Sequence, residues 1–422
     1  MTEKEPLSTE PYKGVHDYYP EDWSIVSSVF DTIRRTLRAY AFEEYQASPL
    51  ERAELYEAKT SEEIVSQQTY TFTDRGDRRV TLRPEMTPTL ARMIAAKRRE
   101  LVFPARWFSI GNRFRYERPQ KGRSREFYQA DVDIVGLTDA RAEGEAVVMA
   151  YEILRAFKAA DADFAIRINS RSLLNVATGA LSLTSEEAAD YLSVLDRMNK
   201  MTEEAFEEAR APFRRNGSDP LELMTNATDA AVEAERQKLL ALIESFRERG
   251  MQNVSFDPTV VRGFLYYTGL VFEVYDTNPE NPRALLGGGR YDDLVSLFGV
   301  EPLSAVGFAI GIETLVDFLT THGLLPTVRA GAQVFIGTPE PDDFAAAQGL
   351  AATLRKAGLS VLVNVSEKAL GDQIKEAVKR NIPYFFAYGK NEEKSGTLRL
   401  KELETGKEEA VSEDELAAFI AR

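Results

Sequence analysis

The chain of 422 residues has no cysteine and only two histidines, His16 and His322. The missing cysteines exclude disulfides, thiolate-ligated zinc, iron–sulfur clusters and a thiol nucleophile. Two histidines make a multi-histidine metal site and a Ser-His-Asp triad poor explanations of any activity. Any catalysis must therefore rest on arginine, lysine, carboxylate, tyrosine and amide groups with the backbone, a set that suits charge stabilisation around phosphates.

Long hydrophobic runs are also missing. Met1 leads into a polar, acidic segment, and no stretch of about 18 apolar residues follows, so we expect no signal peptide, no membrane span and a cytoplasmic location. Two nucleotide signatures are absent as well: the Gly-x-x-x-x-Gly-Lys-Ser/Thr loop, and Gly-x-Gly-x-x-Gly leading from a strand into a helix. A bound nucleotide would therefore rest on an antiparallel sheet with arginine clamps.

Acidic residues outnumber basic ones by 67 to 52, which gives a net charge of −15. Apolar residues make up 44% and charged residues 28%, so there is ample material for a core. At about 150 residues per domain, the length favours two to three domains. A chain this acidic is not a general nucleic-acid binder, and contact with RNA would require a local basic surface.

The first 325 residues carry patterns typical of antiparallel strands with helices, without βαβ repeats. The expected elements are a helix over 22–40, a strand over 43–47 closed by Pro49, paired strands within 69–83, a helix over 87–97, and paired strands over 105–117 and 126–136. Residues 172–250 are polar and helical, which indicates an insertion. Strands resume at Val254 and continue through Val260–Tyr275 and a turn at Gly287–Gly289, and a helix begins near Ile312.

A different pattern follows the linker at 322–331. Three apolar strands, at 334–336, 359–363 and 383–388, alternate with helices over about 90 residues. This alternation predicts a small α/β domain with a mostly parallel sheet. The predicted division is a catalytic core at 1–171 and 251–325, a helical insertion at 172–250, and an α/β domain at 329–422.

The densest chemical feature lies between Arg113 and Arg125. Six basic residues stand there against one acid, Glu117. Such a cluster repels itself and needs an anionic partner, and a loop between strands would present its guanidinium groups to phosphates, which arginine binds bidentately. The alternative is a solvated basic loop that pairs with the acidic surface.

The strand after this loop places Phe127, Gln129, Asp131 and Asp133 on one face. An aromatic ring, an amide and two carboxylates make a poor core but a suitable wall for a cationic, hydrogen-bonding ligand. An edge strand with one solvated face is the alternative. Three other segments, Thr81–Thr87, Arg262–Gly269 and Leu286–Asp292, each admit an ordinary explanation as a strand end, a hairpin or close packing at glycine.

Taken together, these motifs resemble the histidyl-tRNA synthetase family of class II aminoacyl-tRNA synthetases. The matching stretches are Phe114–Arg125, Thr81–Glu85, Arg262-Gly-x-x-Tyr-Tyr and Gly-Gly-Arg290-Tyr-Asp. The resemblance implies an α+β antiparallel-sheet catalytic core with a helical insertion, followed by a C-terminal α/β anticodon-binding domain. The helix over 22–40 is similar to class II motif 1, which implies a homodimer, and Gly307–Glu313 is similar to motif 3.

The resemblance also assigns residues to ATP, bound with Mg²⁺ between its phosphates and without a metal site of the protein's own. Arg115 would hold the α-phosphate and Arg123 the outer phosphates. Phe127 would stack on adenine, and Glu117 would accept from its amino group. Arg118 and Gln120 lie in the loop that the family turns toward the acceptor end of tRNA.

For L-histidine, the implied ligands of the α-amino group are Glu85, Thr87 and Gln129. Asp133, in place of a Glu found in some members, and Tyr267 would read the imidazole, and Tyr266 would line the pocket. Arg262 would lie between the histidine carboxylate and the α-phosphate, so that Arg262 and Arg115 are the implied catalytic residues.

The implied activity is ATP-dependent ligation of L-histidine to tRNA(His) through a histidyl-adenylate. A non-catalytic paralogue, the histidine-binding regulatory subunit of ATP phosphoribosyltransferase, is the alternative, although its usual form lacks the anticodon domain. Two positions depart from the family pattern: Leu265 stands where many members have Asp, and Thr314 stands where motif 3 carries Arg. The outer-phosphate contact of that arginine is then either missing or supplied by another residue such as Arg123 or Arg290.

Overall fold

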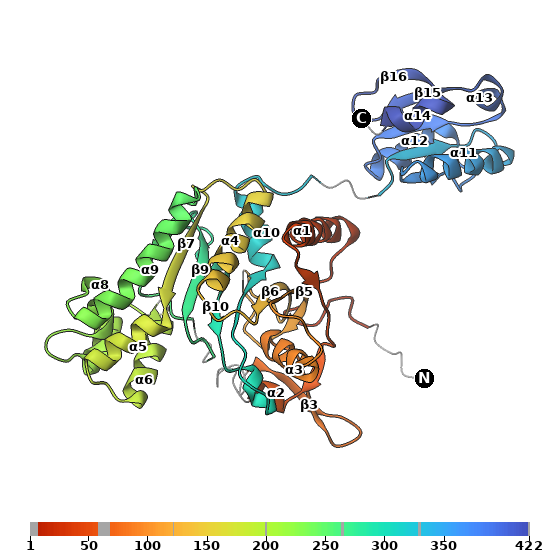
Figure 1. Ribbon diagram of the computed structural model, residues 1–422. Coiled ribbons are helices and arrows are strands. Elements are labelled where there is room, and N and C mark those ends of the chain that lie inside the picture. Colours follow the sequence, from red (N-terminus) through yellow and green to blue (C-terminus); the bar gives the residue numbers. More distant parts are fainter. Residues whose placement is uncertain are drawn as a thin grey trace. The chain divides into compact units, whose positions relative to one another are not determined.

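The computed structural model describes residues 7–57, 68–120, 122–198, 201–262, 266–327 and 331–420. The chain divides into two compact units, the larger containing Ile25–Pro326 and the smaller containing Thr327–Arg422. Figure 1 shows the helices and strands of both. Within the described ranges, no helix is both long enough and apolar enough to cross a bilayer.

The larger unit is built on an eight-stranded sheet in the order β1-β5-β6-β11-β10-β9-β7-β8. The six inner strands pair antiparallel, and the short edge strands β1 and β8 pair parallel. This confirms the predicted antiparallel α+β core. The bounds are β1 (Glu43–Glu44), β5 (Ala105–Phe114), β6 (Glu126–Val135), β7 (Phe164–Ser170), β8 (Val254–Phe256), β9 (Leu270–Asp276), β10 (Ala284–Tyr291) and β11 (Ala305–Gly311).

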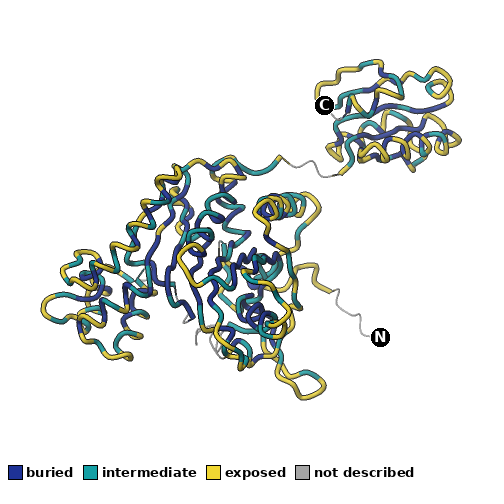
Figure 2. The backbone as a smooth tube through the Cα atoms, viewed as in Figure 1, coloured by how far each residue is buried: buried dark blue, intermediate teal, exposed yellow. Residues whose placement is uncertain are grey.

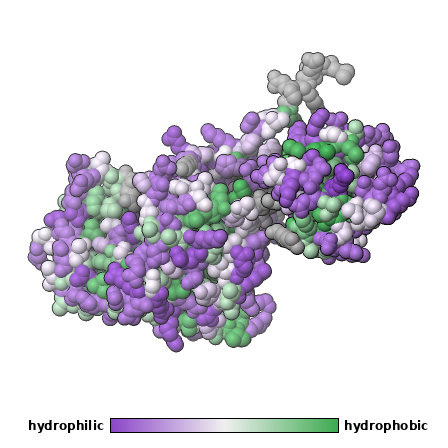
Figure 3. All heavy atoms as spheres, turned by 90° about the horizontal axis from the view of Figure 1, so that it is seen from above, coloured by the Kyte–Doolittle hydropathy of each residue, from purple (hydrophilic) through white to green (hydrophobic). Residues whose placement is uncertain are grey.

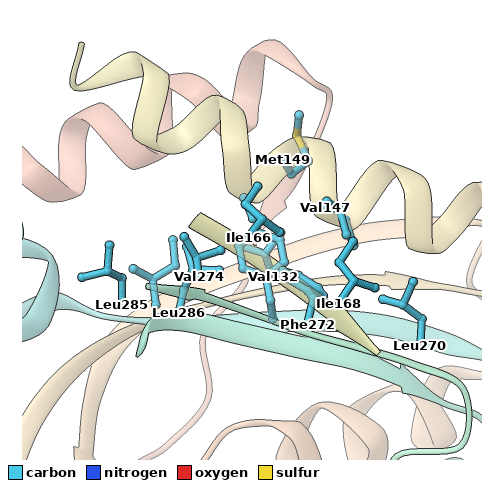
Figure 4. Close-up of a cluster of buried hydrophobic side chains, with 14 of the residues drawn as sticks. Val132, Val147, Met149, Ile166, Ile168, Leu270, Phe272, Val274, Leu285 and Leu286 are labelled. Carbon is cyan, nitrogen blue, oxygen red and sulfur yellow. The ribbon is translucent and has the colours of Figure 1, made fainter. Parts of the chain in front are cut away.

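Alternation along the strands separates a hydrophobic face of this sheet from a polar one. On β6, Val132 and Ile134 enter the main core, whereas the residues between them face the opposite side. The core face is covered by α1 (Pro20–Ala39), α4 (Arg141–Ala156) and α10 (Ile312–Thr321). Figure 4 shows Met149 of α4 above Ile166 of β7 in this core. Figure 2 shows buried residues along the central strands of the sheet.

A three-stranded sheet, in the order β2-β4-β3, precedes the main sheet in sequence. Its strands are β2 (Leu50–Arg52), β3 (Tyr70–Thr73) and β4 (Arg79–Leu82), and α2 (Glu54–Glu57) and α3 (Thr87–Lys97) accompany it. The prediction of one strand over 43–47 is wrong in detail. Pro49 separates two short strands that belong to different sheets, because proline lacks the N–H that a continuous ladder needs.

Helices fill residues 172–250, as the sequence predicts. They are α5 (Arg171–Ala180), α6 (Ser185–Asp196), α7 (Glu203–Arg210), α8 (Pro220–Asn226) and α9 (Ala230–Glu248). Thr184 begins α6 through a capping box with Glu187. Buried residues such as Tyr191 and Phe246 belong to the same hydrophobic cluster as the main sheet.

The smaller unit contains a five-stranded sheet in the order β13-β12-β14-β15-β16. The expected mostly parallel sheet is wrong: β13, β12 and β14 pair parallel, but β15 and β16 form an antiparallel hairpin. The polar composition of this hairpin concealed it, since only Leu398, Leu400 and Val411 are buried along it. The bounds are β12 (Val334–Gly337), α11 (Phe344–Lys356), β13 (Val361–Val363), α12 (Leu370–Lys379), β14 (Tyr384–Ala387), α13 (Lys390–Ser395), β15 (Thr397–Glu402), β16 (Glu408–Ser412) and α14 (Glu413–Ile420).

The three glycines at 287–289 lie in the middle of β10, and the expected turn is wrong. A Cβ on Gly288 would lie 2.5 Å from the Cα of Phe308 on the neighbouring strand β11 and would clash with the carbonyl of Gly307. Strands β10 and β11 therefore approach more closely than any side chain at 288 permits.

Replacing Gly288 by alanine is expected to lower the free energy of unfolding by about 1–3 kcal/mol, the usual cost of overpacking a core. Urea unfolding followed by tryptophan fluorescence measures it, because Trp23 lies in α1 and Trp107 in β5. Gly144→Ala in α4 is the matched control, since a Cβ there meets nothing within 4 Å. Equal midpoints for the two variants would contradict the close-approach explanation.

Candidate active site

A cavity of about 100 Å³ opens on the polar face of the eight-stranded sheet. Its walls come from β6, β10 and β11, the start of α3, and the segment before β9. All seven residues that the family resemblance assigns to histidine line it, together with Arg115. The lining is Glu85, Thr87, Arg115, Gln129, Asp131, Asp133, Arg262, Tyr266, Tyr267, Tyr291, Gly307, Phe308 and Ala309.

The floor of the cavity is the polar face of β6, where Gln129, Asp131 and Asp133 follow one another at alternate positions. Asp133 accepts a hydrogen bond of 2.6 Å from the hydroxyl of Tyr291. Burial raises the pKa of Asp133 to about 8, and the Tyr291 hydrogen bond opposes that rise. A buried, neutral carboxyl at pH 7 can share a proton with a basic ligand.

Asp131 is tied down by a buried ion pair. Arg113 donates to its carboxylate at 2.5 Å, and the Arg113 side chain is fully buried. The expectation that Arg113 belongs to an exposed basic loop is therefore wrong. Arg125 is also buried, with its guanidinium 3.9 Å from the ring centroid of Tyr116. The sequence pattern could not separate these two structural arginines from their exposed neighbours.

Another wall of the cavity is made by Glu85 and two neighbouring tyrosines, whose rings are tilted by 55°. Glu85 is buried and accepts a hydrogen bond of 3.0 Å from the hydroxyl of Tyr266. The rings of Tyr266 and Tyr267 lie with centroids 4.9 Å apart. Thr87, the first residue of α3, completes this wall. A carboxylate beside a hydroxyl is a suitable acceptor pair for an ammonium group.

Arg262 enters the cavity from a strained backbone. Its φ of 51° lies in the left-handed region, and its Nη1 donates to Glu273 of β9 at 3.1 Å. Gly287 lies opposite Glu273, and a Cβ on Gly287 would clash with the guanidinium. The strand expected over 260–275 begins only at Leu270. Leu265, the first of the two departures from the family pattern, lies outside the described residues.

Arg115 lines the cavity from the segment that follows β5. Its Nε donates to the carbonyl of Pro84 at 2.9 Å, and its guanidinium lies 5.3 Å from the ring centroid of Phe127. Burial lowers the pKa of Arg115, while Glu85 and Glu117 oppose that effect. Arg123 is exposed and forms an ion pair of 2.8 Å with Glu117.

Arg290 does not reach this region, so the expectation that it supplies an outer-phosphate contact is wrong. It is buried, and its guanidinium donates to Glu143 of α4 and to the carbonyls of Leu137 and Asp139. Gly269 lies against its aliphatic stem. Arg290 therefore joins β10 to α4, and its guanidinium has no N–H group left to donate to a ligand.

A second cavity, of about 380 Å³, lies beside the loop between β5 and β6. Its lining includes Arg118, Glu117 and Lys13. Arg118 and Gln120 are exposed, and Gln120 pairs with Arg123 across the loop through two backbone hydrogen bonds. Lys121, another of the six basic residues, lies outside the described residues. The loop thus presents cationic and amide groups to a large ligand.

The sequence reasoning missed Tyr291, which holds the Asp133 carboxyl, and the backbone of residues 307–309. A signal was available in both cases. Tyr291 is the tyrosine of the Gly-Gly-Arg-Tyr-Asp stretch, and Gly307 is glycine because a Cβ there would clash with the carboxylate of Asp133.

Comparison with known proteins shows the family to which the chain belongs. The histidyl-tRNA synthetase family model matches residues 14–315, and the anticodon binding domain model matches residues 333–422. A histidine–tRNA ligase of Leptospira biflexa is 41% identical over 409 residues, covering 94% of each chain. A histidine–tRNA ligase of Thermoplasma volcanium is 32% identical and covers 99% of each chain.

The crystal structure of histidyl-tRNA synthetase from Nostoc sp. PCC 7120 has a TM-score of 0.80 and 26% identity, covering 98% of this chain and 99% of that chain. The fold is therefore that of a class II aminoacyl-tRNA synthetase. Within that class, the chain belongs to the histidyl-tRNA synthetase family, which confirms the resemblance seen in the sequence.

Proposed function

We propose that this protein ligates L-histidine to tRNA(His), using ATP and passing through a histidyl-adenylate. The observation that carries the proposal is one small cavity with a proton-sharing carboxyl, Asp133, at its floor and two arginines, Arg115 and Arg262, among its walls. The carboxyl of Asp133 suits the imidazole of histidine. The two arginines suit a carboxylate that meets a phosphate.

In this proposal, the polar lining holds the amino acid by each of its groups. Asp133 and Tyr267 bind the imidazole, with Tyr266 as the adjoining wall. The ammonium group lies against Glu85, Thr87 and Gln129. The residues proposed to bind histidine are Glu85, Thr87, Gln129, Asp133, Arg262, Tyr266 and Tyr267. A site built to pair both imidazole nitrogens rejects analogues that leave its buried groups unpaired.

ATP lies on the adjoining strands. Phe127 stacks on adenine, and the Glu117 carboxylate accepts from its amino group. Arg115, already positioned by the carbonyl of Pro84, binds the α-phosphate. Arg123 reaches the outer phosphates, where its ion pair with Glu117 is shared with the nucleotide.

The reaction needs no protein nucleophile. An oxygen of the histidine carboxylate attacks the α-phosphorus as the bond to pyrophosphate breaks, and the guanidinium groups of Arg262 and Arg115 stabilise the charge that develops. The terminal ribose hydroxyl of the tRNA then attacks the carbonyl carbon, and AMP leaves. Arg118 and Gln120 are the residues proposed to meet the acceptor end.

Magnesium fits the outer-phosphate region. The described residues contain no group of three or more side chains able to hold a metal by themselves. Glu313 has a buried oxygen, Oε1, without a hydrogen-bond partner, and burial raises the pKa of this carboxyl. Mg²⁺ is commonly held by one or two carboxylates and substrate phosphates, so Glu313 would be its protein ligand. Bound there, the ion neutralises phosphate charge.

The remaining parts of the proposal concern tRNA, assembly and location. The smaller unit, which the anticodon binding domain model matches, would hold the anticodon of tRNA(His). The domain limits that we propose are those predicted from the sequence.

We propose a homodimer that forms through α1, where Trp23 is exposed. We also propose a location in the cytoplasm, where tRNA and ATP occur. The visible face in Figure 3 is mainly hydrophilic, which suits the net charge of −15. The regulatory paralogue is the alternative, and the comparisons do not support it better.

Histidine-dependent exchange of pyrophosphate into ATP, measured with each of the twenty amino acids and no tRNA, tests the first step. Exchange with histidine alone is expected. Arg262→Ala should lose roughly 100- to 1000-fold in exchange rate, the usual effect of removing one charge-stabilising donor, while still binding histidine. If histidine binds but no amino acid supports exchange, the synthetase proposal fails and the regulatory paralogue takes its place.

The raised pKa of Asp133 gives a pH prediction for histidine affinity, measured by titration calorimetry. In the complex, Asp133 and the imidazole of histidine share one proton. In the free protein, Asp133 already carries that proton up to about pH 8. Wild-type protein should therefore bind histidine roughly 10- to 100-fold more tightly than Asp133→Asn below this pH, the effect of one charge-assisted hydrogen bond.

Above about pH 8, the wild type must take up a proton to bind histidine, so its advantage over Asp133→Asn should shrink with rising pH, approaching tenfold per unit. The ratio of the two dissociation constants is the useful quantity, because titration of the ligand's own groups cancels in it. A ratio that already changes between pH 5 and 7 would show that Asp133 is ionised in the free protein.

A further inference from the structure

Thr314 stands where the family pattern has arginine, so position 314 itself supplies no positive charge to the proposed outer-phosphate region. It lies on α10, and its hydroxyl donates to the carbonyls of Gly311 and Leu285, at 2.9 and 3.3 Å. Arg290 is held by Glu143 and cannot replace the missing charge. Arg123 shares its charge with Glu117. A polyphosphate beside Thr314 would need another positive group.

Arg283 lies near Thr314. It precedes β10, and its Nη1 donates to the carbonyl of Gly122 at 3.0 Å. A Cβ built on Gly122 would lie 3.5 Å from Thr314 Cγ2 and 3.8 Å from Arg283 Nη1. The guanidinium and the threonine methyl group thus flank the same point of the loop, although Arg283 and Thr314 come from different elements.

The charges around Arg283 favour the binding of an anion. Among the described residues it forms no ion pair with a carboxylate, and its side chain is half-buried. Burial, and then the neighbouring charge of Arg123, lower its pKa, while Glu117 only partly offsets these effects. Two guanidinium groups therefore stand near one carboxylate, an arrangement that an added phosphate group stabilises.

We propose that Arg283 binds the outer phosphates of ATP, and the pyrophosphate that leaves, in place of the cation missing at Thr314. The inference rests on the proposed function and identifies a residue for it that neither the motif pattern nor the expectation for Arg290 included. The planar fork of arginine can keep its bond to the Gly122 carbonyl and still offer donors to phosphate oxygens.

The test uses the full-length protein and compares Arg283→Ala with wild type in histidine-dependent pyrophosphate exchange. KM for ATP and for pyrophosphate should each rise roughly 10- to 100-fold, while KM for histidine stays within twofold. Arg283→Lys should recover part of the loss, because it restores the charge without the fork. Arg236→Ala, on α9, is the matched control and should leave all three constants unchanged.

A second arm separates ATP phosphates from the phosphates of tRNA. Transfer of histidine from preformed, isolated histidyl-adenylate complex to tRNA involves no outer phosphate, so Arg283→Ala should match wild type in that single turnover. A variant that is slow in transfer but normal in exchange would overturn the assignment and place Arg283 on the tRNA.

The outcomes also distinguish this inference from the proposed function. If wild-type protein supports no exchange with histidine, the proposed function itself fails. If wild-type protein exchanges normally and Arg283→Ala keeps its KM for ATP and for pyrophosphate, only the role of Arg283 is refuted. Circular dichroism of the variant excludes unfolding as the cause of any loss.

Discussion

The close approach of β6, β11 and β10 is the constraint on which the rest of the site depends. Gly307 makes room for the carboxylate of Asp133, and Gly287 makes room for the guanidinium of Arg262. If the strands lay at ordinary spacing and carried larger side chains at positions 287 and 307, those side chains would occupy this space. The glycines instead leave two ionisable groups, the Asp133 carboxyl and the Arg262 guanidinium, facing one cavity, at the cost of backbone entropy in a central strand.

Buried arginines support this arrangement before any substrate binds. Arg113 pairs with Asp131, and Arg290 joins β10 to Glu143 of α4. Removing one partner of such a pair typically costs about 3–5 kcal/mol, because an unpaired charge then remains in a medium of low polarity. These arginines fix strands and carboxylates in place. In the proposed function, Arg115, Arg123, Arg262 and Arg283 bind phosphates and the histidine carboxylate, so neighbouring arginines have different roles.

Much of this could be predicted from the sequence. The periodicities indicated the antiparallel core and the helical insertion, and the residues assigned to histidine line one cavity together with Arg115. Other features depend on contacts between distant segments. The β15–β16 hairpin is too polar for an apolar pattern to reveal it, and the burial of Arg113 follows from Asp131 on the next strand. Arg283 is 31 residues before Thr314, and nothing local in the sequence relates them.

The central claim is that the histidine carboxylate attacks the α-phosphorus and forms a histidyl-adenylate. Its most direct test is aminoacylation with histidine labelled with ¹⁸O in the carboxylate, followed by mass spectrometry of the AMP released. The bridging oxygen of a histidyl-adenylate comes from histidine and stays on phosphorus when the tRNA hydroxyl attacks the carbonyl carbon. One ¹⁸O atom in each AMP is expected, and AMP without the label would contradict the account.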